Sequence, residues 1–103
     1  MPWALILPMI FDVIMKCMEE RKKNQDEIVE MMMNPGEEER RICRWATRKA
    51  LSLGGYFQGK SFKKRRKILE EGRERAWDRL ENTTRIEAEV MVAGVAARMG
   101  VGQ

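Results

Sequence analysis

The sequence predicts an all-α protein, with a helical hairpin followed by a long third helix and with association into an oligomer. Three observations lead to this prediction. Apolar residues recur every three or four positions over most of the 103 residues, the period of an amphipathic helix. Asn34-Pro35-Gly36 and Gly54-Gly55 divide the chain into three helical stretches. No alternation of apolar and polar residues lasts long enough to indicate a strand.

The first helix is expected over residues 8–33. Residues 1–15 form an apolar N-terminal segment with a single charge, Asp12. Pro8 is predicted at the first helical position, where its missing N–H has no cost. After the charged middle of this stretch the same apolar period continues, so we expect the helix to run on to Met33.

The second helix is expected to end at Leu53. Asn34 is the predicted N-cap, with Pro35 at the first helical position and Glu37 close behind, and Gly54-Gly55 ends the helix. The spacing places the following residues on the buried face, opposite the arginines: Ile42, Trp45, Ala46, Ala50 and Leu53.

The third helix is expected to begin after Ser61, its predicted cap, and to continue to about Arg98. Gly72 and the pair Thr83-Thr84 are its weakest points. A break near 82–84 is the main alternative to one continuous helix.

Length and composition predict one small domain, 1–103, with a thin core. The absence of His excludes Ser-His-Asp and Cys-His catalysis and every metal site that needs imidazole. Cys17 and Cys43 are too few for a disulfide framework or a four-ligand metal site. We therefore expect no enzyme, no metal and no cofactor. Both cysteines fall on apolar faces, which favours reduced thiols inside a cell or a virion.

Charge is strongly segregated along the chain. Residues 1–39 carry four basic and nine acidic side chains, a net charge of −5. Residues 40–79, the basic middle, carry fourteen basic and four acidic side chains, a net charge of +10. Residues 80–103 carry two basic and three acidic side chains, a net charge of −1. Five of the cations are adjacent, Lys63 to Lys67, and so cannot all share one face of a helix.

Such a block attracts a polyanion, because Lys and Arg that neutralise phosphates release condensed counterions. The candidates are nucleic acid, an anionic membrane face and an acidic protein. The alternative is a solvated surface balanced by the acidic first third of the chain. The predicted polyanion-binding residues are Arg40, Arg41, Arg44, Arg48, Lys49, Lys60, Lys63, Lys64, Arg65, Arg66 and Lys67.

Both ends of the chain are apolar, and they are the predicted contacts with a membrane or with other copies. A bilayer span needs about 20 apolar residues, which the first segment does not supply, so it would lie in a membrane interface or join an oligomeric bundle. Small residues in the C-terminal helix, 86–101, allow close helix approach. The alternative is that the two ends pack on each other as a core. The predicted contacts are Trp3, Leu5, Ile6, Leu7, Ile10, Phe11, Ile14, Val90, Ala93, Gly94 and Ala97.

Trp3 lies in the apolar N-terminal segment just before the first predicted helix, and the second and third predicted helices contain Trp45 and Trp77. An anchoring role in the core is expected ahead of stacking on nucleobases.

The opening Met1-x-Trp3-Ala4-x-x-Leu7-Pro8-x-Ile10 resembles the start of the small internal virion proteins of short-tailed bacteriophages, over about ten of the 103 residues. Those proteins are ejected with the genome. The resemblance implies a helical, oligomeric virion component that touches DNA and contacts a membrane, in the virion or the host cytoplasm. The chain departs from that pattern after the start, where it becomes acidic and then basic instead of rich in Gln and Ala.

The leading hypothesis is therefore a non-enzymatic structural or assembly protein, a phage virion component whose apolar helices pack in an oligomer or on a membrane and whose basic middle contacts DNA. One alternative is a small regulator that binds nucleic acid without sequence preference, and another is an inhibitor of a host protein. Deletion of residues 1–15 is expected to leave DNA binding intact in a regulator and to abolish assembly in a structural component.

Overall fold

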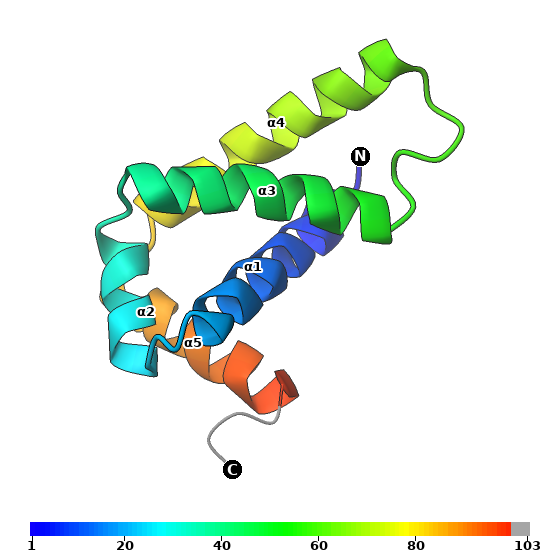
Figure 1. Cartoon of the computed structure of the whole chain (residues 1–103). Helices are drawn as coiled ribbons and strands as arrows, with labels where there is room; N and C mark the ends of the chain where they lie inside the picture. Colours follow the sequence, from blue (N-terminus) through cyan, green and yellow to red (C-terminus); the bar gives the residue numbers. More distant parts are fainter. Residues whose placement is uncertain (100–103) are drawn as a thin grey trace.

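Five helices and no strand make up residues 1–99, the part of the chain that the computed structural model describes (Figure 1). The predicted all-α class is confirmed. Residues 100 and 101 of the predicted C-terminal apolar segment lie outside this part. The helices are α1 (Trp3–Glu20), α2 (Gln25–Met33), α3 (Glu37–Leu53), α4 (Phe62–Glu81) and α5 (Arg85–Met99).

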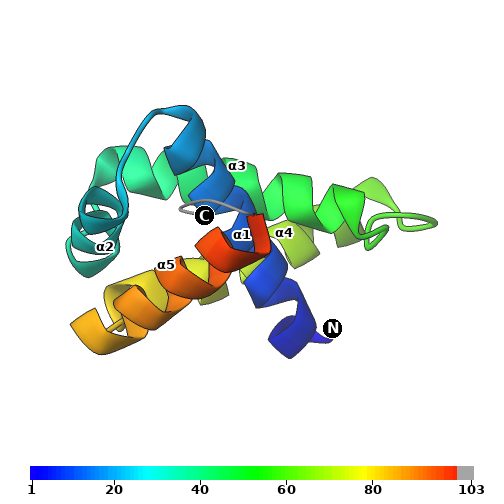
Figure 2. The ribbon, with the colours of Figure 1, turned by 90° about the horizontal axis from the view of Figure 1, so that it is seen from below.

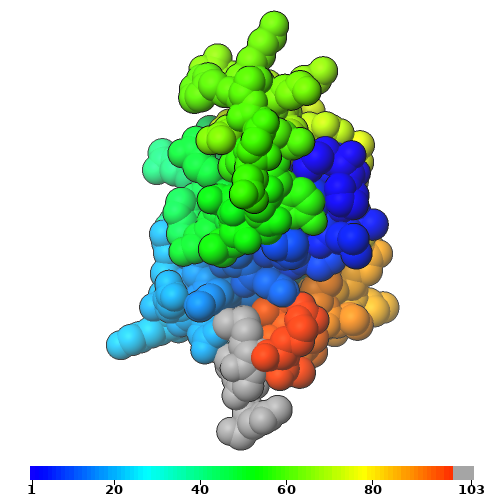
Figure 3. Space-filling model, turned by 90° about the vertical axis from the view of Figure 1, so that its right-hand side faces the viewer, coloured from blue at the N-terminus to red at the C-terminus, as the bar shows by residue number. Residues whose placement is uncertain are grey.

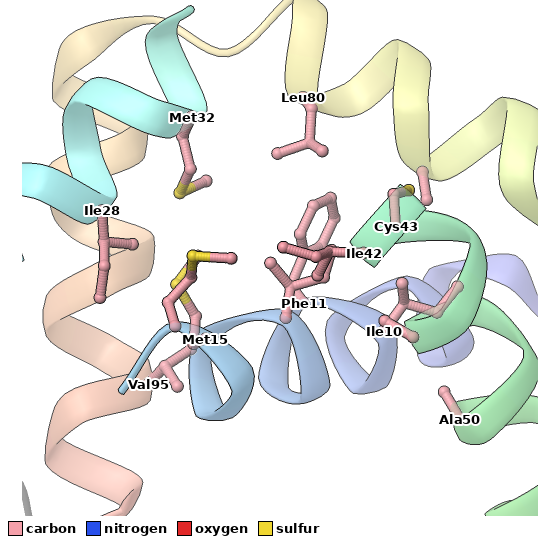
Figure 4. Packing of buried hydrophobic residues seen from close by; sticks show 14 of the residues in the cluster. Ile10, Phe11, Met15, Ile28, Met32, Ile42, Cys43, Ala50, Leu80 and Val95 are labelled. Carbon is pink, nitrogen blue, oxygen red and sulfur yellow. The ribbon is translucent and has the colours of Figure 1, made fainter. Parts of the chain in front are cut away.

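The helices enclose one hydrophobic core, with α1 at its centre. α3 and α4 run antiparallel and pack on α1, and α2 packs against α5 at one end of the molecule (Figures 1 and 2). All five helices contribute side chains to the core, among them Phe11, Met32, Ile42, Leu80 and Val95 (Figure 4). The radius of gyration is 13.6 Å, close to the roughly 13 Å expected of a folded chain of 100 residues.

The predicted helix over residues 8–33 is wrong at its start and in its middle. α1 begins at Trp3, and Pro8 lies inside it. The buried side chains of Trp3 and Ile6 draw this first turn onto the core, so burial outweighs the missing hydrogen bond of the proline. Helix geometry then stops at Glu20, because Lys22 adopts a φ of 61° and Asn24 starts α2.

Asn24 and Glu27 form a reciprocal cap at the start of α2. The Glu27 N–H donates to Asn24 Oδ1 over 2.8 Å, and the Asn24 N–H donates to the Glu27 carboxylate over 3.4 Å. The pair satisfies two backbone donors that a helix start leaves free. This cap separates α2 from α1.

α3 matches the predicted second helix except at its first turn. Asn34 ends α2, and the N-cap of α3 is Gly36. The Gly36 N–H donates to Glu39 Oε2 over 2.8 Å. The predicted end at Leu53 is confirmed, since Gly55 takes a φ of 74° and the chain turns away.

The buried face of α3 differs from the predicted one. Ile42, Ala46 and Ala50 are buried as expected, but Trp45 is 47% exposed and Leu53 is 71% exposed. α3 packs on both α1 and α4, and its buried residues also include Cys43, Thr47 and Leu51. The buried arc is therefore rotated toward these three residues and away from Trp45.

The single long third helix is also wrong, and the alternative break at 82–84 is confirmed. Ser61 caps α4 as predicted, its Oγ accepting from the Lys64 N–H over 3.3 Å. At the break, Thr84 Oγ1 accepts from the Glu87 N–H over 3.2 Å at the start of α5. The break lets α5 turn back and cover α1 and α2 instead of extending into solvent.

Candidate nucleic-acid interface

The eleven predicted polyanion-binding residues, here called the basic surface, belong to α3, the start of α4 and the loop between them. Ten of them are exposed, and Lys60 in the loop is half-buried. Figure 3 shows the start of α4 projecting from one end of the molecule, with its long side chains standing away from the body. The hairpin of α3 and α4 therefore gathers cations that the sequence spreads over 28 positions, from Arg40 to Lys67.

No residue of the basic surface forms an ion pair with another described residue. The ion pairs that connect separate helices use arginines outside this surface. The acidic first third of the chain supplies Asp12, Glu30 and Glu38 to three of these pairs, whose arginines are Arg98, Arg85 and Arg21. In the part of the chain that the structure describes, the acidic first third thus forms no ion pair with the basic surface.

A groove of about 670 Å³ between the end of α3 and the start of α4 concentrates this charge. Four arginines line it against a single carboxylate, Glu70. The remaining walls are apolar or hydroxylic. We call it the arginine groove, and its lining residues are Arg48, Ser52, Phe57, Phe62, Arg65, Arg66, Leu69, Glu70 and Arg73. Guanidinium groups at this density suit phosphate, which they can bind bidentately.

A second groove, of about 290 Å³, continues along the same two helices toward the start of α3. Its charges are balanced, three arginines against three carboxylates, so it attracts anions less strongly than the arginine groove does. Arg73 lines both grooves, and its Nε is buried without a hydrogen-bond partner among the described residues.

Arg73, Phe57 and Phe62 belong to the arginine groove but are absent from the predicted site. Arg73 carried a signal, since it lies seven positions after Arg66 and shares a helix face with it. Phe57 carried none, because only the turn after α3 brings it back to α4.

Two aromatic side chains are exposed among the cations of the basic surface. Trp45 is 47% exposed, and Lys49 Nζ lies 5.0 Å from its ring centroid. Phe62 is 76% exposed, and the Arg66 guanidinium carbon lies 5.3 Å from its ring centroid. Trp3 and Trp77 differ, since the first is buried and the second is half-buried and packed against the core.

The predicted membrane or oligomer contacts divide into three groups by their burial. Five of them are buried in the chain's own core, namely Trp3, Ile6, Ile10, Phe11 and Ile14. Leu5 and Val90 are 68% and 67% exposed, and Ala93 and Ala97 are exposed as well. Leu7 and Gly94, both half-buried, line an apolar groove of about 440 Å³ between α1 and α5, to which Val90 also contributes.

Among residues 1–99, no helix has the length and hydropathy that a bilayer crossing requires.

Cys43 borders the balanced groove, while Cys17 is half-buried on α1; both are free thiols. Burial raises the pKa of Cys43 to about 11, although a hydrogen bond with Thr47 and the nearby charges of Arg40 and Arg44 act in the opposite direction. Cys43 is therefore a protonated core side chain at neutral pH.

Comparison with known proteins gives no relative for this arrangement. The chain matches no protein-family model, no curated protein and no solved structure. Residues 1–99 also contain no cluster of three or more side chains suited to bind a metal ion. The basic surface presents arginine and lysine side chains next to exposed aromatic rings.

Proposed function

We propose that this chain is a non-enzymatic protein that binds nucleic acid through the phosphate backbone, without reading its sequence, at the surface formed by α3 and α4. The observation that carries the proposal is the basic surface itself, eleven cations with no ion-pair partner among the described residues. Unpaired cations gain most from phosphates, because each contact releases a condensed counterion.

The arginine groove is the proposed centre of this contact. Its four arginines can hold successive phosphates, while exposed lysines on either side extend the positive surface along the backbone. Such phosphate contacts position the protein on the nucleic acid without contacting the bases.

The test measures affinity for short duplexes of two unrelated sequences by fluorescence anisotropy at several salt concentrations. We expect both duplexes to bind equally, with affinity falling steeply between about 50 and about 200 mM salt. Arg48→Glu with Arg66→Glu should weaken binding at least about tenfold and reduce the salt slope. A flat salt response, or a variant that binds as tightly as the unaltered protein, would contradict the proposal.

Lys16→Glu with Lys22→Glu is the matched control. Both positions are exposed, lie outside the basic surface and form no ion pair with another described residue. Both double variants change the net charge from +4 to zero. A loss confined to the groove variant separates a local site from a general attraction to positive charge.

A second function, assembly with other copies, is favoured by the apolar groove between α1 and α5. Val90 is exposed at this groove beside Gly94, and Leu5 is exposed on α1 next to Ala4, which lines the groove. An exposed apolar patch on a small protein marks a contact with another molecule more often than a surface without a partner. The proposal that this assembly takes place in a virion rests on the resemblance of residues 1–10 to internal virion proteins.

The test of assembly is the mass of the protein in solution. We expect a mass above 12.1 kDa in plain buffer that drops to the monomer in Leu5→Asp with Val90→Asp. Leu53→Asp, at an equally exposed site on α3, is the control. A monomer in plain buffer would contradict self-assembly. Deletion of residues 1–15 cannot serve as the test, since it removes much of the core.

A further inference from the structure

We propose that the basic surface binds single-stranded nucleic acid in preference to duplex, with Trp45 and Phe62 as platforms on which unpaired bases stack. This deepens the proposed function and rests on it. The two exposed rings carry this proposal, because neither is part of the hydrophobic core.

Both rings are exposed to solvent. Trp45 and Phe62 leave 47% and 76% of their surface in solvent, although large apolar side chains are the ones that a small core most needs. Trp3 supplies the contrast, since its ring is 7% exposed and its Nε1 donates to Glu71 Oε1 over 3.1 Å. The chain thus buries one tryptophan and presents another among the arginines of α3.

A cation lies over each of the two rings. Lys49 lies over Trp45 and Arg66 lies over Phe62, each from one turn further along the same helix. A cation held at a ring can contact the phosphate next to a base that stacks on that ring. Arg41, Arg44 and Arg48 extend the positive charge on α3 around Trp45.

Exposed rings favour a single strand over a duplex. Bases of a duplex stack on one another inside the helix, and their faces are out of reach of a side chain. Unpaired bases offer their faces, and stacking on an aromatic side chain tolerates any base. A duplex uses only the cations of this surface, whereas a single strand uses both the cations and the rings.

The test compares an oligothymidine of about 20 nucleotides, a duplex of equal length and an abasic strand with the same phosphates, each labelled with fluorescein. We expect the oligothymidine to bind at least about tenfold more tightly than the abasic strand and the duplex. Trp45→Ala should lose about tenfold on the oligothymidine and less than about twofold on the other two. Trp45→Phe should retain most of the affinity, because a smaller ring still stacks.

Tryptophan fluorescence gives a readout that a change of charge or stability would not mimic. Oligothymidine should quench the emission of the unaltered protein, and the quenching should be much smaller in Trp45→Ala, which keeps Trp3 and Trp77. Leu53→Ala, which removes another exposed apolar side chain of α3, should behave as the unaltered protein does.

The outcomes separate the two proposals. If duplex and single strand bind equally and Trp45→Ala weakens neither, base stacking is refuted while phosphate binding stands. If no probe binds at low salt, the nucleic-acid function itself is refuted. If Trp45→Ala weakens all three probes alike, the ring supports the surface without stacking, and the proposed role of Trp45 as a platform for bases is overturned.

Discussion

At the residue scale, Cys43 couples the stability of the fold to alkaline pH. Its pKa lies near 11 in the folded chain, above the ordinary value of 9.0. The neutral buried thiol thus contributes fully below pH 9, and its contribution is lost as the pH rises toward 11. Two pKa units correspond to about 2 to 3 kcal/mol.

We therefore expect the unaltered protein to lose stability relative to Cys43→Ala between about pH 9 and about pH 11. The measurement is the free energy of unfolding in urea at each pH for both proteins. Taking the difference removes the titration of lysine and tyrosine, which both proteins share. Parallel curves would show that Cys43 ionises as freely in the folded chain as in the unfolded one.

Gly72 allows α4 to approach α3 and α1 closely. A Cβ added there would lie 2.9 Å from Thr47 Cγ2 and 3.0 Å from two ring carbons of Trp3. Thr47 is fully buried and Trp3 nearly so, and neither can move aside without disturbing the core. A larger residue at this position therefore forces the helices apart.

We expect Gly72→Ala to lower the free energy of unfolding by about 1 to 3 kcal/mol, since overpacking exceeds the gain in helix propensity. Gly94→Ala is the paired variant, because a Cβ there meets only an Arg98 nitrogen at 3.6 Å. It should gain about 0.5 to 1 kcal/mol. Thermal unfolding of both variants tests the opposite signs, and a stabilising Gly72→Ala would refute the close approach.

At the element scale, α1 carries a proline where most helices would not tolerate one. Pro8 lies in the second turn and has no N–H to donate to the Ala4 carbonyl. The ring is exposed, so it adds little to the core in return. The first two turns are held by the burial of Trp3 and Ile6.

Pro8→Ala should therefore stabilise the protein, by about 1 to 3 kcal/mol in urea-induced unfolding. Pro35→Ala is the control, since Pro35 lies between α2 and α3 and interrupts no helix. That substitution should give no gain, because it only adds freedom to the unfolded chain. Equal effects of the two substitutions would mean that Pro8 costs α1 nothing.

Local signals in the sequence were enough for some boundaries and not for others. Gly54-Gly55 and Ser61 act on adjacent backbone, and both were predicted. The break before α2 also has a local signal, Asn24-x-x-Glu27. The spacing of apolar residues hides this signal, because the apolar residues of α1 and α2 fit the period of one continuous helix.

Burial and site geometry depended on neighbours that sequence spacing does not reveal. Trp45 has the spacing of a core residue, and its exposure follows from where α1 and α4 pack on α3. The charge of the basic surface was predictable from composition. The arginine groove was not, since it depends on the turn between α3 and α4, which brings Phe57 to the same groove as Arg73.

At the scale of the whole molecule, the unpaired cations of the basic surface repel one another, and this repulsion lowers the stability of the folded state. Salt screens charges that lie further apart than about 10 Å at 0.1 M. A polyanion that binds the folded state adds its binding free energy to stability. The isolated protein should thus be least stable at low ionic strength.

We expect the melting temperature to rise as sodium chloride is raised from about 10 mM to about 150 mM, and to rise further with an excess of oligonucleotide. Arg48→Glu with Arg66→Glu should flatten both responses. Differential scanning fluorimetry on the two proteins measures this. A melting temperature that falls with salt would mean that attractive pairs outweigh the repulsion.

The placement of α1 also brings together parts of the chain that are far apart in the sequence. Trp3 bonds to Glu71 across 68 positions, and Asp12 pairs with Arg98 across 86 positions. Closing loops of this length costs conformational entropy before the contacts repay it. The chain is accordingly expected to reach its native state more slowly than a helical bundle whose contacts are all local.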